Sequence, residues 1–277
     1  MTEAKVLGKR ESAFGRRFLI GLAVLISVLF LVVPLVYIFA QAFQKGVMPV
    51  LENLGNAEML HAIGLTVGIA LITVPVNLLF GIMLAWCAAR FDFPGKPLLL
   101  AATDIPFAVS PVVAGLIYLL WYGANGPLAP RLDAAQIQIL FAWPGMVLVT
   151  IFVTCPFVAR ELIPVMQSRG AAEEEAAILL GASGWQMFRY VTLPNISWAL
   201  LYGVLLTNAR AIGEFGAVSV VSGSIRGETM TLPLQIELLE QDYNTVGAFT
   251  AAAALSLLAV LTLLLKKWLE GRRSAAR

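Results

Sequence analysis

The sequence predicts an all-α integral membrane protein with six transmembrane helices and both termini in the cytoplasm. Three observations lead to this fold class. First, 59% of the 277 residues are hydrophobic and 13% are charged, whereas soluble domains average about 45–50% and about 25%. Second, six apolar runs are long enough to cross a hydrocarbon layer of about 30 Å as helices. Third, lysine and arginine are concentrated in alternate loops, which sets the orientation of such helices.

The expected spans form one six-helix domain over residues 18–268, between tails at 1–17 and 269–277. Its helices cover residues 18–40, 62–88, 98–122, 137–158, 196–221 and 245–268. The first and last runs are unambiguous. The second, third and fourth are interrupted by prolines, and we expect neighbouring helices to shelter the freed backbone groups. These prolines are Pro75, Pro106, Pro111, Pro144 and Pro156.

The distribution of basic residues places both ends of the chain in the cytoplasm. With that orientation, fifteen of the nineteen lysines and arginines fall in cytoplasmic segments, three in outer segments and one, Arg210, inside a span. The N-terminus also imitates a cleavable signal peptide, because Ala40-Gln41-Ala42 follows an apolar run. That run is 23 residues long, beyond the roughly 7–15 of a signal peptide, so we expect it to stay as an anchor.

Several function classes lack the residues they need. The chain has no G-x-x-x-x-G-K-[ST] phosphate loop, no H-E-x-x-H, no G-x-S-x-G and no Cys-x-x-Cys. Cys87 and Cys155 lie in apolar runs, and His61 has no companion ligand nearby. We therefore expect no catalytic residue, metal or cofactor in this chain, and no nucleic-acid partner. The outer loops, 41–61, 123–136 and 222–244, are too short to hold a ligand-binding domain.

The longest loop, residues 159–195, is cytoplasmic and holds the sequence EEEAAILLGASGWQMFRYVTLP. Glu173, Glu174 and Glu175 are expected to open a short helix, where acids complement the helix dipole. Gly181 and Gly184 permit a turn with positive φ, after which a second short helix ends at Pro194. The result is an apolar knob facing the cytoplasm, suited to docking a protein. An amphipathic helix lying on lipid is the alternative, which the acids disfavour beside an anionic leaflet.

This loop resembles the EAA loop of ABC importer permeases, whose pattern is E-A-A-x3-G-x9-I-x-L-P. The matching residues are Glu175, Ala176, Ala177, Gly181, Leu193 and Pro194, with Val191 in place of the isoleucine. In such permeases the loop docks into a cleft of the ATPase subunit and passes nucleotide-driven motion to the membrane helices. The resemblance implies that the matching residues couple this chain to an ATPase.

Three longer stretches, 104–116, 207–223 and 231–253, are similar to permeases of sulfate and thiosulfate importers, more to their W-type than to their T-type subunit. The resemblance implies the type I, MetI-like importer fold and a bacterial inner-membrane location. It implies half of a channel completed by a homologous T-type permease or a second copy, with two ABC ATPases that bind ATP and magnesium and a periplasmic sulfate- or thiosulfate-binding protein.

Two other functions remain open from the residues. One is an ABC permease for molybdate or tungstate, which are tetrahedral dianions like sulfate. The other is an ion- or proton-coupled secondary anion transporter, with Asp104 and Glu214 as proton carriers. The absence of an obvious internal repeat disfavours the second, since many such transporters are built from repeated halves.

Three charged residues fall inside the expected spans away from their ends. Asp104 lies in the third span, whereas Arg210 and Glu214 lie four residues apart in the fifth and can pair on one helix face. Each costs about 2.5–3.5 kcal/mol at a helix centre, so we expect none to face lipid. Straight helices would keep Asp104 away from Arg210. Two interpretations stay open: the pair ties the bundle together, or Arg210, with Thr207 and Asn208, lines an anion pathway.

Overall fold

A computed structural model describes residues 13–274 of the chain, which contain helices and no strands. The outer parts of the expected tails, 1–12 and 275–277, lie outside the described residues, and the cytoplasmic side of the termini stays a prediction. The elements, in order, are α2 (Ala13–Ser27), the π-helical turn η1 (Val28–Val32), α3 (Val33–Ala42), α4 (Val47–Gly55), α5 (Ala57–Arg90), α6 (Lys96–Ala108), α7 (Pro111–Tyr122), α8 (Ala129–Ala135), α9 (Trp143–Thr154), α10 (Pro156–Arg169), α11 (Ala172–Leu179), α12 (Gly184–Met187), the π-helical turn η2 (Phe188–Thr192), α13 (Leu193–Ile212), α14 (Gly216–Ser222), α15 (Leu232–Gln241) and α16 (Thr245–Ser274).

Within the described residues, five helical stretches are long and apolar enough to cross a membrane. They are Gly15–Ala42, Ala57–Arg90, Trp143–Arg169, Gly184–Ile212 and Thr245–Leu264. A sixth span exists only if α6 and α7 count together, and the chain bends by 106° between these two helices. The prediction of an all-α, multi-pass protein is confirmed, and the proline-interrupted third span expected over 98–122 is divided into α6 and α7.

The prolines act differently from one another. Val109 is extended and Ser110 is also non-helical just before Pro111, because a residue that precedes proline disfavours helical geometry, and this separates α6 from α7. Pro75, by contrast, lies inside α5 without ending it. Pro144 and Pro156 occupy first turns of α9 and α10, where the missing N–H would have no helical partner.

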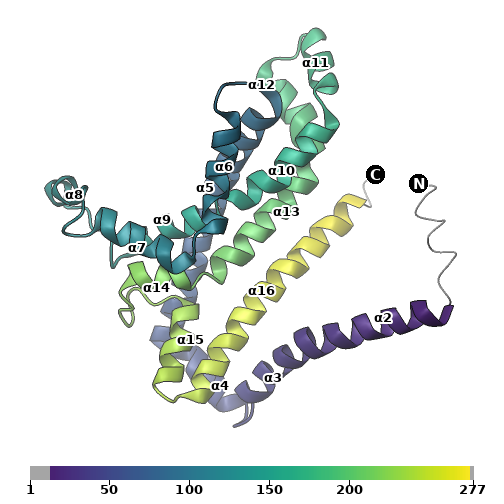
Figure 1. Cartoon of the computed structure of the whole chain (residues 1–277). Coiled ribbons are helices and arrows are strands. Elements are labelled where there is room, and N and C mark those ends of the chain that lie inside the picture. Colours follow the sequence, from purple (N-terminus) through teal and green to yellow (C-terminus); the bar gives the residue numbers. More distant parts are fainter. Residues whose placement is uncertain (1–12, 275–277) are drawn as a thin grey trace.

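Three helices, α5, α10 and α13, lie side by side in the centre of the molecule (Figure 1). Glycines let them approach closely around one residue of α10. A Cβ built on Gly81 of α5 would lie 2.5 Å from the Val158 Cβ, and one built on Gly203 of α13 would lie 3.0 Å from the Val158 Cα. Small residues at helix contacts are typical of membrane bundles. Asn77 of α5 adds a hydrogen bond, donating to the Thr154 Oγ1 at 2.6 Å.

The fifth span ends earlier than the sequence predicted. It was expected over 196–221, but α13 ends at Ile212 and the chain turns into the separate helix α14. The carboxylate of Glu214 accepts the N–H of Ala217 at 3.1 Å, which caps the first turn of this new helix. The expected outer loop 222–244 likewise contains α15, where Leu232 and Leu234 are buried. These segments therefore form part of the core.

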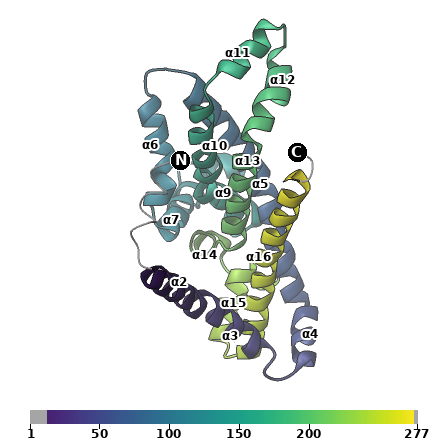
Figure 2. The same ribbon diagram turned by 90° about the vertical axis from the view of Figure 1, so that its right-hand side faces the viewer.

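The first membrane helix stands apart from the rest. Its most apolar window has no buried residue, and α2 diverges from the bundle in both views (Figures 1 and 2). Contact with the bundle comes at its far end, where α3 packs on α16 and the Tyr37 and Phe249 rings meet edge to face at 5.9 Å. A face this apolar and this exposed is compatible with lipid or with another membrane chain.

Candidate functional site

The segment with the three glutamates lies at one extreme end of the molecule. Helices α11 and α12 project beyond the ends of α5 and α10, and the C-terminal end of α16 points toward the same end (Figure 1). As predicted, Glu173, Glu174 and Glu175 occupy the first turn of a short helix, α11. Most of the expected loop 159–195 is helical, because α10 continues to Arg169 instead of ending at 158.

The turn after α11 depends on one glycine rather than two. Gly181 has φ +89°, in the region that favours glycine, whereas Gly184 is simply the first residue of α12. Ser183 and Gln186 start α12 with reciprocal side-chain to backbone hydrogen bonds. The expected stop at Pro194 is wrong: the helix continues from α12 through η2 into α13. Pro194 lies in the first turn of α13, directly after a π-helical turn that accommodates the irregularity.

An apolar surface covers this end of the chain, and we call it the docking face. Leu179 and Leu180 are 88% and 89% exposed. The full set is Ile178, Leu179, Leu180, Trp185 and Tyr190. The residues that match the family pattern lie beside it, with Glu175, Ala176, Gly181 and Pro194 exposed and Ala177 and Leu193 half-buried. Two short helices joined by a tight turn thus present large apolar side chains away from the bundle.

Glu174, and not Glu175, holds α11 to the bundle. Its carboxylate accepts two hydrogen bonds from Arg90, from Nε to Oε2 at 2.7 Å and from Nη2 to Oε1 at 3.0 Å. Thr192 donates a third from its hydroxyl to Oε1 at 2.8 Å. Arg90 uses its remaining arm to donate to the Met166 carbonyl at 3.0 Å. Both charged side chains are nearly buried, with exposed fractions of 12% and 10%.

Glu173 makes a parallel contact on the exposed side of α11. It accepts a short hydrogen bond from the Asn195 side-chain amide, and the Asn195 oxygen accepts from Arg169 at 3.0 Å. Two adjacent glutamates therefore contact the same end of the bundle, one through a nearly buried ion pair and one through exposed polar groups.

Arg210 and Glu214 form an ion pair, with Nη1 and Oε2 2.6 Å apart. The expectation that both lie on one helix is only partly met, since Glu214 falls in the link after α13. The two side chains differ in access: Glu214 is 1% exposed and Arg210 is 34% exposed. Thr207 is buried and donates its hydroxyl to the Gly203 carbonyl, and Asn208 is half-buried. The geometry turns the acid inward and leaves the guanidinium partly accessible.

Asp104 pairs with Arg160 of α10. The Arg160 Nε and Nη2 each lie 3.0 Å from one oxygen of Asp104, and the guanidinium also stacks on the Phe107 ring at 4.2 Å from its centre. Arg160 was expected in the cytoplasmic loop, but the continuation of α10 places it in a helix facing α6. Both side chains are about half exposed, so this pair differs from the two more buried ones.

Comparison with known proteins identifies the family of the chain. Residues 77–275 match the family described as binding-protein-dependent transport system inner membrane component. The chain belongs to this family. It is 71% identical to the "Sulfate transport system permease protein CysW" of Escherichia coli K12, over 98% of this chain and 94% of that protein. The CysW protein of Synechocystis is 54% identical over 92% of each chain, and the E. coli CysT protein is 35% identical over 88% and 90%.

Solved structures share the fold of this inner membrane component. A chain of a bacterial ABC transporter that imports the acidic polysaccharide alginate has a TM-score of 0.74 at 16% identity, covering 93% of this chain and 95% of that one. The same kind of transporter in complex with a periplasmic protein bound to an alginate pentasaccharide gives 0.72 at 18% identity, over 91% of each. The likeness shows that the folds agree from near one end to the other.

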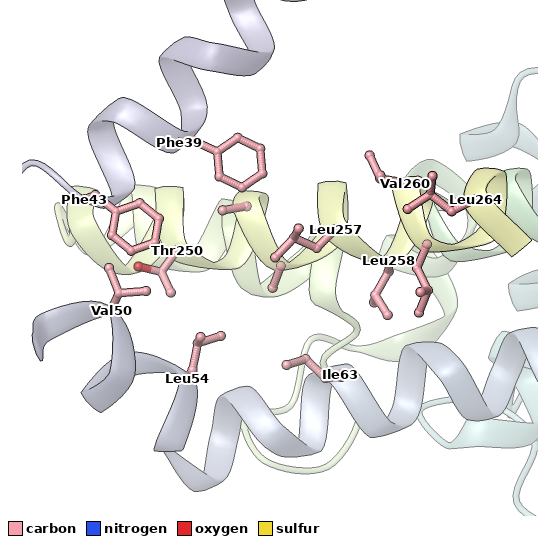
Figure 3. Close-up of a pocket in the computed structure, with 13 residues that line it drawn as sticks. Phe39, Phe43, Val50, Leu54, Ile63, Thr250, Leu257, Leu258, Val260 and Leu264 are labelled. Carbon is pink, nitrogen blue, oxygen red and sulfur yellow. The ribbon is translucent and has the colours of Figure 1, made fainter. Parts of the chain in front are cut away.

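An apolar cavity of about 460 Å³ lies between α3, α4, α5 and α16 (Figure 3). Its walls are hydrocarbon apart from the hydroxyl of Thr250, which donates to the Val246 carbonyl of its own helix at 2.7 Å. A dianion requires hydrogen-bond donors or positive charge, so this cavity suits hydrocarbon chains, and Arg210 is not among its lining residues.

Sequence reasoning missed two functional candidates, Arg90 with Glu174 and Arg160. Arg90 and Arg160 were counted only as markers of orientation, although each makes a specific ion pair. The position of Arg90 in the sequence could have indicated this role. Arg90 comes just after an expected span, at the depth where the acidic segment returns to the bundle.

Proposed function

We propose that this chain is the W-type permease subunit of an ATP-driven importer for sulfate and thiosulfate. The observation that carries the proposal is the exposed docking face at the end of the bundle, built on the residues that match the EAA pattern. A monomer gains nothing by exposing Leu179 and Leu180 to water, whereas burying each against a partner contributes about 1.5–3 kcal/mol. The names of the similar permeases support the anion.

Sulfate import also requires the energy that a docked ATPase supplies. A dianion that enters a cell against an inside-negative potential is opposed by about 2.3 kcal/mol per charge per 100 mV, or about 4.6 kcal/mol for two charges. A passive pathway would therefore release sulfate under most conditions. The short segments outside the bundle suit a protein that receives its anion from a separate binding protein.

The proposed complex contains this chain, a homologous T-type permease, two copies of an ABC ATPase and a periplasmic sulfate- or thiosulfate-binding protein. The ATPases bind ATP and magnesium, and the permease itself is not a catalyst. The complex lies in a bacterial inner membrane, with the docking face and both termini of this chain in the cytoplasm. The similarity of the chain to both W-type and T-type proteins supports a pair of related permeases.

Within this complex, Arg210 lines the anion pathway. The partial exposure of its guanidinium supports the role, and so does the inward position of Glu214, because a free carboxylate beside the pathway would repel a dianion. Asn208 lies on the same stretch of α13. Asp104 is occupied by Arg160 and contributes to an ion network rather than to a proton relay.

The test is transport by the purified complex in liposomes that contain ATP. We expect sulfate to accumulate only with ATP and the binding protein, with thiosulfate as a competitor. Stronger competition by molybdate or tungstate would reassign the anion. Uptake by the isolated chain under a pH gradient, without ATP, would replace the ABC permease by a secondary transporter.

A further inference from the structure

Helix α11 has one point of buried attachment to the rest of the molecule. Among its eight residues, Glu174 alone is buried. Glycines with positive φ flank the helix, Gly170 at +67° and Gly181 at +89°, and a side chain at either position would meet open space. Without Glu174, α11 would be held by its two chain connections and by exposed polar contacts.

The attachment has a geometry that resists both translation and rotation. The guanidinium fork of Arg90 meets the two carboxylate oxygens of Glu174 through parallel hydrogen bonds, and such planar, two-bond pairs fix orientation as well as distance. Thr192 holds the same carboxylate from a second direction. A nearly buried pair of this kind is also screened much less by salt than an exposed one.

The same ion pair joins the ends of the three central helices. Arg90 is the last residue of α5, and its third contact is the carbonyl of Met166 near the end of α10. Thr192 is the last residue of η2, which runs directly into α13. Glu174 thus contacts, directly or through Arg90, the helices that pack closely around Val158.

We propose that Glu174 and Arg90 are the positioning residues through which α11 moves the central helices when an ATPase bound at the docking face changes conformation. This inference rests on the proposed function and deepens it. The docking face receives the force, and the ion pair of Arg90 with Glu174 delivers it to α5, α10 and α13 together. Glu174 need not touch the ATPase to do so.

The neighbouring Glu173 offers a matched control. It lies on the same helix turn, carries the same charge and contacts the same end of the bundle through Asn195. If α11 were held only by the sum of its polar contacts, Glu173→Gln and Glu174→Gln would have similar effects. If the buried pair transmits motion, only the second substitution changes coupling.

The experiment uses the complete importer in liposomes, with wild-type, Glu174→Gln and Glu173→Gln permeases. Three quantities are measured: the amount of ATPase that co-purifies, the rate of ATP hydrolysis, and the sulfate accumulated per ATP hydrolysed. We expect Glu174→Gln to retain its ATPase and to hydrolyse ATP, but to move roughly tenfold less sulfate per ATP, a coupling effect of ordinary size. Glu173→Gln should match the wild type in all three.

An unchanged ratio of sulfate to ATP in Glu174→Gln overturns the proposal. If that variant fails to assemble, Arg90→Lys decides, since it keeps the charge and loses the fork: a lowered ratio in the assembled complex supports the proposal, and a wild-type ratio overturns it. Recovery of coupling in the exchanged pair Arg90→Glu with Glu174→Arg gives further support. If sulfate does not change the rate of ATP hydrolysis by the wild-type complex, the proposed function is refuted, and this inference with it.

Discussion

The two most buried ion pairs among the described residues are arranged in opposite ways. Arg90 and Glu174 come from elements far apart in the sequence, and hydrogen bonds occupy every arm of the arginine. Arg210 and Glu214 are four residues apart, and the arginine stays one-third exposed while the acid is buried. The first arrangement joins separate elements and keeps the guanidinium nearly buried, with each of its nitrogens hydrogen-bonded. The second holds a positive charge in place and keeps it available, as an anion site requires.

The largest expected effect tests that availability. Arg210→Ala alone would leave Glu214 buried and unpaired, so the change is made together with Glu214→Gln, which keeps an acceptor for the Ala217 N–H. Because the loss of a charge-assisted hydrogen bond weakens the binding free energy of the anion strongly, sulfate uptake should fall about 100-fold. Uptake and co-purification of the ATPase are measured together, with Glu214→Gln as the control. Normal transport by the double variant would remove Arg210 from the pathway.

The second effect tests the docking face. Leu179→Ser combined with Leu180→Ser should weaken binding of the ATPase at least about tenfold, because these side chains lose their burial in the complex. The thermal stability of the permease alone should stay the same, since both residues are exposed in it. Titration of the ATPase against the purified permease measures the affinity. Ile225→Ser, an exposed apolar residue in the link between α14 and α15, is the control and should bind normally.

The third effect distinguishes two nearby glycines, Gly181 and Gly184. Gly181→Ala places a side chain at φ +89°, which costs about 1–2 kcal/mol and redirects α11, so sulfate-stimulated ATP hydrolysis should drop about fivefold. Gly184→Ala has ordinary helical geometry and open space, so its rate should stay at the wild-type value. Equal losses of ATP hydrolysis in the two variants would mean that the added side-chain volume, rather than the backbone conformation, lowers the rate.

The smallest effect concerns the half-exposed pair. Asp104→Asn removes one charge but keeps a hydrogen-bond acceptor for Arg160, which also retains its stacking on Phe107. Exposed ion pairs contribute within about 1 kcal/mol, so thermal stability and uptake should change little. A loss of sulfate uptake as large as that of the Arg210 variant would show that the exposure of an ion pair does not predict its importance for transport.

The sequence predicted what depends on composition and spacing, and it failed where tertiary contacts decide. Hydropathy located the membrane helices, but Pro75 and Pro111 look alike in a sequence although only the second separates two helices. The apolar run over 196–221 concealed the turn after Ile212, because α14 is buried by protein. The spacing from Glu175 to Pro194 predicted a coupling segment at this end of the chain, which stays a prediction. Which of three adjacent glutamates turns inward depends on Arg90, and no local pattern contains that information.

The close contact at Val158 has a mechanical consequence. Gly81 and Gly203 bring two helices close to this one residue, so α10 packs most tightly there. Val158 would then be the point about which α10 tilts. Met166, whose carbonyl binds Arg90, lies eight residues along the helix, about 12 Å away. A push on the docking face would tilt α10 about Val158 and move α9, which lies on the other side of Val158, in the opposite direction.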